Sequence, residues 1–531
     1  MSVYNASPLS LRSPVASART VARTVGEVPW TPDLGDGRYK NPVLFADYSD
    51  PDVVRVGDDY WLTASSFTDT PGLPILHSKD LVNWRLVNHA IKRVPHPRYD
   101  QVHPGCGVWA PSIRFHDNKF WIFFPLPDEG IFVTTATDPA GEWSEPWMLV
   151  EGKGLIDPSP LWDDDGKAYL VHAYAKSRAG IKHRLVVRPM APDASRLLGD
   201  GKVVFHDPEN HPTSEGPKFH KWNGWYYISA PAGGVATGWQ LILRSRNVYG
   251  PYEHKVVLEQ GNSSDVNGPH QGAIVDTPNG DWWFLHFQER QPYGRIVHLQ
   301  PMRWKDGWPF IGEDRDNNGI GEPVTTHAKP VSIASAVQVP ATSDEFIHTH
   351  LGLQWQWHAN SQDNWHSLTA RPDWLRLYAQ PAPSDDLYLL PNALLQKLPA
   401  EAFVVETSVE VTDGAEAGLA VIGIESAAIT VRRVGTDTEI RLVIAGNTAR
   451  TAVLQADSLK LRLAMHPGGL CQFAYSDGTH WVTLQESFQA MEGKWIGAKI
   501  GIYCSTLNIG KPDGYADFDY FRVLPPSQRQ S

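Results

Sequence analysis

Cysteine is scarce in this chain. Three residues, Cys106, Cys471 and Cys504, are scattered through 531 positions, and an odd, widely spaced set does not form a disulfide framework. We therefore expect a reducing compartment. Apolar runs of membrane-spanning length are absent, and the first thirty residues carry basic side chains without the continuous apolar core of a signal peptide. The sequence thus predicts a soluble, cytoplasmic protein with no membrane partner.

Clustered positive charge is also missing. The chain has 47 Lys and Arg against 59 Asp and Glu, a net charge of −12, and no basic stretch that could follow a phosphate backbone, so nucleic acid is not expected as a partner. Aromatic residues are abundant instead, with 21 Trp, 18 Tyr and 18 Phe. Most of these are expected to be ordinary strand residues, but such rings also form apolar platforms for sugar faces.

Helical periodicity is nearly absent between residues 41 and 312, whereas one type of segment recurs there. In each copy a polar Asp, Asn or Gly turn precedes an aromatic-rich strand, which is typical of a β-hairpin. The copies are about 50 to 60 residues apart, the length of one four-stranded propeller blade. Five copies predict a five-bladed β-propeller; their aromatic positions are Tyr60, Phe120, Tyr169, Tyr226 and Trp283. Two β-sandwiches in tandem would not explain the near-constant spacing.

A second set of motifs lies about ten residues before each aromatic strand: SDPDVV, VWAPSI, DPSPLW, EGPKFH and HQGAIV. Equivalent offsets in equivalent blades place these motifs near the start of each inner strand, around the central axis. The sequence therefore predicts that five residues far apart in the chain converge on one pocket: Asp50, Trp109, Asp157, Glu215 and His270.

A chain of this length needs more than one hydrophobic core. We expect a poorly ordered segment over residues 1–38, the propeller over 39–323, and a linker rich in Ala, Ser, Pro and Val over 324–343. From residue 344 to 531 short runs alternate between apolar and polar residues, which favours a β-sandwich. The predicted fold class is therefore all-β, a propeller followed by a sandwich.

The predicted pocket holds three carboxyls, which suits hydrolysis of a glycosidic bond by one acid and one carboxylate. Asp50 and Glu215 lie on different blades, and a separation of about 6.5–9.5 Å would leave room for a water and predict inversion. Pro51 is expected to hold Asp50 in an extended, fixed orientation suited to a general base. Nearby negative charge should raise the pKa of Glu215 toward that of a working acid, and Asp157 would tune that acid.

Other acidic residues near these motifs are expected to be solvated, because they lie in hairpin turns or point outward by strand alternation: Asp52, Asp163, Asp164 and Asp165. A single Asp-Pro pair is usually only a turn. The shared register across five repeats is what distinguishes Asp50, Asp157 and Glu215.

Taken together, the motifs resemble glycoside hydrolase family 43. The resemblance runs over almost the whole chain and rests on SDPDVVRVGDDYW, PGLPI, HSKDLVNW, VWAP, DPSPLWDDDG, EGPKF and GPHQG in that order. It implies a five-bladed propeller with inverting chemistry, in which Asp50 is the general base, Asp157 the pKa modulator and Glu215 the general acid. The stretch from His298 and the sandwich resemble the branch of β-xylosidases and exo-α-L-arabinofuranosidases, whose second domain is a concanavalin-like jelly roll.

By the same resemblance, Phe67 and Trp109 would shape the subsite for the non-reducing sugar, and Arg295 would face the substrate. His270 resembles an axial histidine that helps to hold calcium or water in some members, although a neutral, hydrogen-bonded histidine is the commoner arrangement. Asp344 and Asp517 would form a structural calcium site in the sandwich. No cofactor is required by the expected reaction, and the expected partner is an oligosaccharide such as arabinoxylan or xyloglucan fragments.

Three alternatives remain open at this point. One is a non-catalytic carbohydrate-binding propeller, although the five axial residues differ chemically where a lectin would repeat one site. Another is an endo-acting arabinanase, which usually lacks the sandwich. A fructoside-processing propeller is disfavoured, because SDPDVV replaces the Asn-Asp-Pro-Asn-Gly type of motif. The choice between xylose and arabinose and the oligomeric state are not indicated by the sequence.

Overall fold

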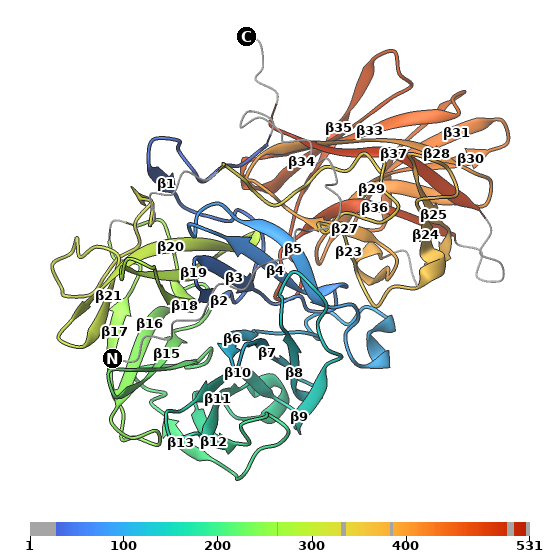
Figure 1. Cartoon of the computed structure of the whole chain (residues 1–531). Helices are drawn as coiled ribbons and strands as arrows, with labels where there is room; N and C mark the ends of the chain where they lie inside the picture. The colour runs from blue at the N-terminus through green and yellow to red at the C-terminus, as the bar shows by residue number, and fades with distance from the viewer. Residues whose placement is uncertain (1–27, 263, 331–335, 383–385, 507–513, 527–531) are drawn as a thin grey trace.

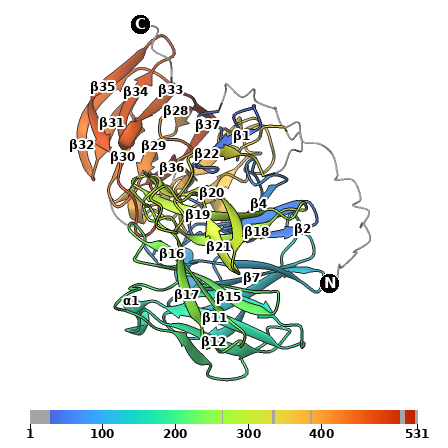
Figure 2. The same cartoon turned by 90° about the vertical axis from the view of Figure 1, so that its left-hand side faces the viewer.

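The computed structural model describes residues 28–262, 264–330, 336–382, 386–506 and 514–526. Two β-rich units lie against each other, a propeller and a sandwich (Figure 1), and a view turned by 90° shows the same arrangement (Figure 2). The one α-helix of the described part, α1 (Lys176–Ala179), has four residues, and no helix in that part is long and apolar enough to cross a bilayer. Most of the segment predicted to be poorly ordered, residues 1–27, lies outside the described residues.

The propeller has five blades, each a four-stranded antiparallel sheet in chain order. Blades 1 and 2 contain β2 (Asp52–Val56), β3 (Asp59–Thr63), β4 (Gly72–Ser78), β5 (Arg85–Ile91), β6 (Ser112–His116), β7 (Lys119–Leu126), β8 (Gly130–Ala136) and β9 (Trp147–Glu151). Blade 3 contains β10 (Leu155–Trp162), β11 (Ala168–Tyr174), β12 (Leu185–Met190) and β13 (Lys202–Phe205). Blades 4 and 5 contain β14 (Lys218–Trp222), β15 (Trp225–Ala232), β16 (Trp239–Ser245), β17 (Glu253–Leu258), β18 (His270–Asp276), β19 (Trp282–Arg290), β20 (Gly294–Lys305) and β21 (Trp308–Ile311).

The predicted repeat is confirmed strand by strand. Its five aromatic markers all lie in the second strand of a blade, namely β3, β7, β11, β15 and β19. The polar turns before them adopt the left-handed backbone that tight hairpins need; Asp117 and Asn118 have φ of 49° and 56°. Apolar side chains of blade 5, such as Leu285, pack with Tyr60 and Leu62 of blade 1, so the first and last blades close the ring.

The sandwich consists of two sheets around one apolar core. One sheet has the order β23 (Gln356–Trp357), β27 (Leu394–Lys397), β36 (Lys499–Thr506), β29 (Glu416–Ile422), β30 (Ser426–Val434), β31 (Asp437–Ile444) and β32 (Asn447–Leu454), with β26 (Gln380–Pro381) beside β36. The other has the order β24 (His366–Ser367), β25 (Leu375–Tyr378), β37 (Tyr515–Leu524), β28 (Phe403–Val411), β33 (Ser458–His466), β34 (Leu470–Ser476) and β35 (Trp481–Gln489). The prediction of a propeller followed by a sandwich is thus confirmed.

Part of the predicted linker is itself a strand. Within residues 324–343, β22 (Thr326–Ala328) pairs with β1 (Arg38–Lys40) in a small antiparallel sheet. Sequence composition did not indicate this pairing, because a two-stranded sheet of three residues each carries almost no periodic signal. The pair joins the beginning of the propeller to the segment that leads into the sandwich.

The two domains share a continuous interface. Phe45, Tyr293 and Ile296 of the propeller belong to the apolar core of the sandwich, and the backbones of Thr70 and Trp357 form an antiparallel bridge with N···O distances of 2.7 and 2.9 Å. The interface also buries an ion pair between Lys499 of β36 and Asp69 of blade 1, whose side chains are 6% and 2% exposed. Such an interface holds the sandwich in a fixed position over the propeller.

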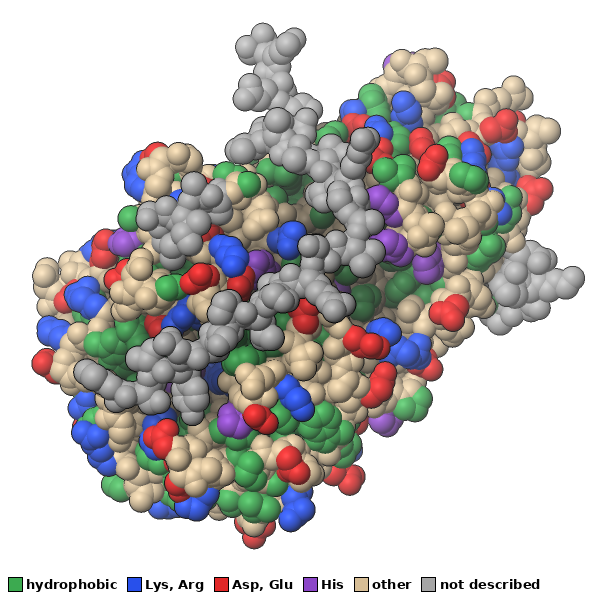
Figure 3. All heavy atoms as spheres, in the orientation of Figure 1, with side chains coloured by type: hydrophobic (Ala, Val, Ile, Leu, Met, Phe, Trp, Pro, Cys, Tyr) green, Lys and Arg blue, Asp and Glu red, His purple; other side chains and the backbone are tan. Residues whose placement is uncertain are grey.

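The visible face in Figure 3 mixes acidic and basic side chains over both domains. No large area of a single charge is seen on that face, which agrees with the absence of basic clusters in the sequence.

We predict that Lys499→Met destabilises the protein by about 3–5 kcal/mol, because it leaves the buried Asp69 carboxylate without its cation. Denaturant unfolding monitored by fluorescence and circular dichroism measures the effect. Lys460→Met, an exposed lysine of β33 in the same domain, is the matched control and should change stability by less than about 0.5 kcal/mol. Equal stability of the two variants would contradict the prediction.

Candidate active site at the propeller axis

A shared backbone conformation marks the axial end of four blades. Asp50, Asp157, Gly216 and Gln271 have φ of 55°, 56°, 55° and 56°, which is the left-handed region that Asp and Gly tolerate better than most residues. The prediction that Pro51 keeps Asp50 extended is therefore wrong. The left-handed turn, rather than the proline alone, directs the Asp50 side chain.

This pattern also corrects the register predicted for the axial residues. Asp50 and Asp157 occupy the left-handed position itself, whereas Glu215 and His270 lie one residue before it. Trp109 stands in the same relation to Ala110-Pro111 as Glu215 does to Gly216-Pro217. The axial residues thus form two sets. Asp50 and Asp157 are themselves the left-handed residues, whereas Glu215, with its longer side chain, directly precedes the left-handed Gly216.

Position 216 requires a glycine. A Cβ atom at this residue would lie 2.8 Å from Cδ of Gln271 and 2.8 Å from Cγ of Pro231, closer than side chains approach one another. Its backbone N–H donates a 2.7 Å hydrogen bond to Oδ2 of Asp157. This bond joins blade 3 to blade 4 and fixes the Asp157 carboxylate beside Glu215.

The Asp50 carboxylate is held by two donors. Nη1 of Arg295 lies 2.9 Å from Oδ1, and the Ser65 hydroxyl donates to Oδ2 at 2.6 Å. Both donors stabilise negative charge on Asp50. Arg295 is positioned in turn by Asp47, whose Oδ1 accepts the Arg295 backbone N–H at 3.0 Å. The structure therefore brings the predicted Asp50 and Arg295 into direct contact.

Glu215 has different surroundings. Burial raises its pKa to about 8, and the negative charge of Asp157 adds to this effect, with a smaller part from Asp50. The pKa of Asp157 is also raised, by burial and by Asp50, while the Gly216 N–H opposes the shift. Burial and mutual repulsion thus favour a proton on the pair of Glu215 and Asp157, and the shift is larger for Glu215.

A buried polar network lies beneath these carboxyls, and it corrects the expectation that Asp52 is solvated. Asp52 is fully buried, and its Oδ2 accepts hydrogen bonds from the Ile113 N–H at 2.8 Å and from Nη1 of Arg114 at 2.7 Å. Lys218 of blade 4 reaches the same carboxylate at 3.7 Å and donates to Ser112 of blade 2 at 2.9 Å. Blades 1, 2 and 4 are thus joined around the axis.

Asp163 is a second correction. Its side chain is 4% exposed, is ion-paired with Lys221 and accepts a 2.5 Å hydrogen bond from the Tyr226 hydroxyl. Asp164 is 89% exposed and Asp165 is exposed, as expected. Alternation along a single strand cannot reveal such inter-blade contacts, because the partner comes from the next blade.

Phe67 and Trp109 lie on adjoining backbone segments. Phe67 and Val108 exchange two backbone hydrogen bonds of 2.9 Å, and Trp109 directly follows Val108 in the chain. Trp109 also contacts Trp495 of the sandwich, with ring centroids 6.5 Å apart and planes inclined by 66°. Nε1 of Trp109 is buried and has no hydrogen-bond partner among the described residues.

A cavity of about 750 Å³ lies between the two domains beside Arg295, and the three carboxyls Asp50, Asp157 and Glu215 are not among its lining residues. Arg295 and Glu289 line it from blade 5, and Glu492, Lys494 and Trp495 line it from the sandwich. Burial and nearby negative charge raise the pKa values of Glu289 and Glu492. Sequence reasoning found Arg295 but missed the residues from the sandwich, because the loop over residues 490–498 has no counterpart in the propeller repeat.

His270 is buried at the axis. Its Nε2–H donates to the Gly234 carbonyl at 2.9 Å, and burial lowers its pKa to about 4, so the ring is neutral and Nδ1 keeps its lone pair. Nδ1 has no hydrogen-bond partner among the described residues. His270 belongs to no group of three or more candidate metal ligands in that part of the chain, and its role as a metal ligand stays a prediction.

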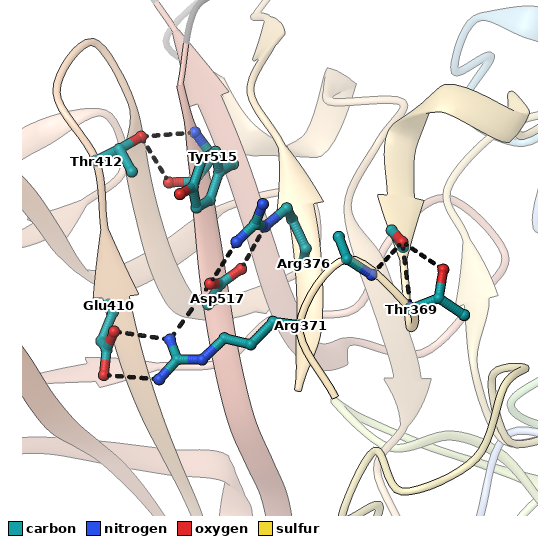
Figure 4. Close-up of polar contacts among 9 residues, drawn as sticks. Thr369, Arg371, Arg376, Glu410, Thr412, Tyr515 and Asp517 are labelled. Atoms are coloured by element: carbon teal, nitrogen blue, oxygen red, sulfur yellow. Dashed lines mark hydrogen bonds and ion pairs between the residues drawn. The ribbon is translucent and has the colours of Figure 1, made fainter. Parts of the chain in front are cut away.

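The predicted calcium site in the sandwich does not fit the residues present. The Asp517 carboxylate accepts hydrogen bonds from Nε and Nη2 of Arg376 at 2.7 and 2.9 Å and from Nη1 of Arg371 at 3.3 Å (Figure 4). Asp344 accepts the Trp355 indole N–H at 2.9 Å and the Phe346 N–H at 2.9 Å. Calcium binds carboxylate oxygens that are free to coordinate it, whereas these carboxylates already serve guanidinium and N–H donors. The assignment of Asp344 and Asp517 as calcium ligands is therefore corrected.

Both domains of the chain match known protein families. The model of the family described as Glycosyl hydrolases family 43 matches residues 39–309, and that of the Beta xylosidase C-terminal Concanavalin A-like domain matches residues 343–524. A protein of Xylanibacter ruminicola is 40% identical over 475 residues, which are 88% of this chain and 86% of that protein. A β-xylosidase of Formosa agariphila is 36% identical over 376 residues, which are 65% of this chain and 63% of that protein.

Two further proteins are similar in sequence or structure. A non-reducing end α-L-arabinofuranosidase of Bacteroides ovatus is 32% identical over 65% of each chain. The crystal structure of a GH43 protein from Bacillus licheniformis superposes with a TM-score of 0.81 at 26% identity, covering 92% of this chain and all of the other.

The raised pKa of Glu215 has a consequence for stability. Unfolded glutamate loses its proton near its ordinary value of 4.5, whereas folded Glu215 keeps it to about pH 8. The folded state binds the extra proton between these values, so stability falls as the pH rises through that window. We predict that Glu215→Gln is more stable than the wild type by about 1–3 kcal/mol at pH 8 and that the gap narrows toward pH 5.

Thermal unfolding at pH 5, 6, 7 and 8 measures this difference. Glu209→Gln is the matched control, because Glu209 is exposed on the same segment. The raised pKa of Glu215 would be refuted if the difference in stability between Glu215→Gln and the wild type did not change with pH. It would also be refuted if Glu209→Gln showed the same difference.

Proposed function

Because the chain belongs to glycosyl hydrolases family 43, we propose that it releases single pentose residues from the non-reducing ends of hemicellulose oligosaccharides, with inversion at the anomeric carbon. The protein is a glycosidase that hydrolyses O-glycosyl bonds. The proposed substrates are fragments of arabinoxylan or xyloglucan.

The proposed terminal sugar is β-1,4-linked xylose or α-L-arabinofuranose. Relatives carry both activities in their names, a β-xylosidase in Formosa agariphila and an α-L-arabinofuranosidase in Bacteroides ovatus. These sugars differ in ring size and anomeric configuration but expose similar hydroxyls, so one pocket with an apolar wall and a few polar groups can accept either.

The observation that carries the mechanism is the contrast between Asp50 and Glu215. Asp50 is ion-paired with Arg295 at 2.9 Å, whereas burial and Asp157 raise the pKa of Glu215 to about 8. An ion-paired carboxylate beside a carboxyl whose pKa is raised provides the base and the acid that glycoside hydrolysis requires.

In the proposed step Glu215 gives its proton to the leaving glycosidic oxygen as the bond from that oxygen to the anomeric carbon breaks. Asp50 takes a proton from the water that attacks the opposite face of that carbon. The released sugar carries the oxygen of the water and has the inverted configuration. Proton exchange with solvent then returns Glu215 to the acid form and Asp50 to the carboxylate.

The remaining residues would position the substrate and tune the acid. Asp157 would keep the proton on Glu215 by charge repulsion, and Arg295 would hold Asp50 while facing the sugar. Phe67 and Trp109 would form the apolar wall of the subsite, and the free Nδ1 of His270 would accept a hydrogen bond from a sugar hydroxyl or water. Every proton transfer is assigned to a side chain or water, so the proposed reaction needs no metal ion.

The exo mode is supported by the wall that the sandwich contributes. Trp495 contacts Trp109 and lines the interdomain cavity together with Arg295. A chain that passes through the site needs an open groove on both sides, as in an endo-acting arabinanase, whereas a walled cavity admits a chain end. Three free cysteines suit a reducing compartment, and we propose that the enzyme acts in the cytoplasm.

We predict that the enzyme hydrolyses nitrophenyl β-D-xyloside or nitrophenyl α-L-arabinofuranoside and that proton NMR detects the inverted anomer as the first product. Arabinoxylan and xyloglucan oligosaccharides tested in parallel should lose terminal pentose only. A first product of retained configuration would refute the mechanism, and release of internal oligosaccharides would favour the endo alternative.

We also predict that Glu215→Gln lowers kcat on an unactivated oligosaccharide by about 10²–10⁴-fold, because the leaving oxygen then has no proton donor. The loss should be much smaller on nitrophenyl glycosides, whose leaving group needs no proton, and the alkaline limb of the pH profile should disappear. Glu209→Gln serves again as the control and should retain wild-type activity on both substrates. Equal losses on both substrates would show that Glu215 is not the acid.

A further inference from the structure

Three candidate metal ligands meet beside the outer strand of blade 4. Asp207 and His211 lie in the connection between β13 and β14, and His254 lies in β17. One ligand atom from each residue lies within 4.8 Å of the other two. Among the described residues this is the one group of three or more such side chains, and the proposed reaction uses none of them.

Local contacts hold these ligands in place. The His211 N–H donates to the Asp207 carbonyl at 2.9 Å, which closes a turn. The Asp207 carboxylate accepts the Asn210 N–H and its side-chain amide at 3.1 Å, leaving further lone pairs on both oxygens. The His254 ring packs on Phe205 with centroids 5.3 Å apart and stands 5.0 Å from the His211 ring at 87°.

The lone pair of the His211 imidazole is only weakly used. Its Nδ1 accepts a long, 3.3 Å hydrogen bond from the Trp239 indole. A bond to a metal ion would replace that weak contact.

The kind of ion follows from the donors. Two imidazoles and one carboxylate suit zinc and related transition metals, whereas calcium and magnesium prefer oxygen ligands alone. His254 is exposed, so water can complete a four-coordinate site from the solvent side.

We propose that Asp207, His211 and His254 bind one divalent transition metal ion of the zinc class, which fastens the segment over residues 207–211 to β17. Only three residues lie between His211 and Glu215, and the Ser214 hydroxyl donates to the His211 carbonyl at 2.6 Å. The ion therefore restrains the segment that leads directly to the proposed general acid. Its role is structural, since the ion takes no part in bond cleavage.

Calorimetric titration of the EDTA-stripped full chain with zinc chloride tests the proposal. The wild type should bind one zinc ion per chain that His254→Ala does not bind, because the variant lacks one of the three protein ligands. Because His254 is exposed, its alanine variant should fold. His206→Ala is the matched control, since His206 is an exposed histidine of the same connection outside the ligand group, and it should bind zinc like the wild type.

Two further measurements separate binding from misfolding. Zinc should raise the thermal midpoint of the wild type and of His206→Ala but not that of His254→Ala or His211→Ala. Cobalt(II) should give visible absorption bands with the wild type that the His254 variant lacks. The proposal is overturned if the wild type binds no zinc, if both ligand variants bind it unchanged, or if His206→Ala loses it.

Discussion

Closure of the ring between the first and fifth blades is the constraint on which the site depends, and Asp47 is the residue at its centre. Its carboxylate accepts the Ser49 hydroxyl at 2.6 Å and the Arg295 N–H at 3.0 Å, and it also accepts the Gly497 N–H of the sandwich at 2.7 Å. One side chain thus joins blade 1, blade 5 and the second domain. Arg295 and Asp50 meet because both ends of the propeller chain are held to the same buried carboxylate.

The axial chemistry follows from this closure. Charges buried at the meeting point of five sheets have little water to stabilise them, so each carboxyl takes its state from the donors in reach. Asp50 has a guanidinium and a hydroxyl, whereas Glu215 has Asp157 as its neighbour. Two residues of similar intrinsic acidity therefore take opposite roles. The network of Asp52, Arg114 and Lys218 below them spreads the remaining charge over three blades.

The repeat made much of this predictable. Turn and strand residues recur with nearly constant spacing, so the number of blades, the second strand of each blade and the convergence of Asp50, Asp157 and Glu215 followed from the sequence. Finer features did not follow. The one-residue offset of Glu215 and His270 depends on a left-handed backbone position, and the burial of Asp52 depends on Arg114 and Lys218 from other blades. Asp344 and Asp517 were mistaken for calcium ligands because a sequence does not show that arginines or indole N–H groups already occupy a carboxylate.

Because Trp495 of the sandwich lines a cavity together with propeller residues, the two domains are not independent modules. An accessory domain on a tether can be exchanged or removed without changing the catalytic cavity. Here the cavity is lined from both sides, and Phe45 and Tyr293 of the propeller are packed in the core of the sandwich. A propeller cut at residue 323 would lose one side of the interdomain cavity beside Arg295 and expose those aromatic side chains to water. The smallest unit that can be grafted or evolved for a new sugar is therefore the pair of domains.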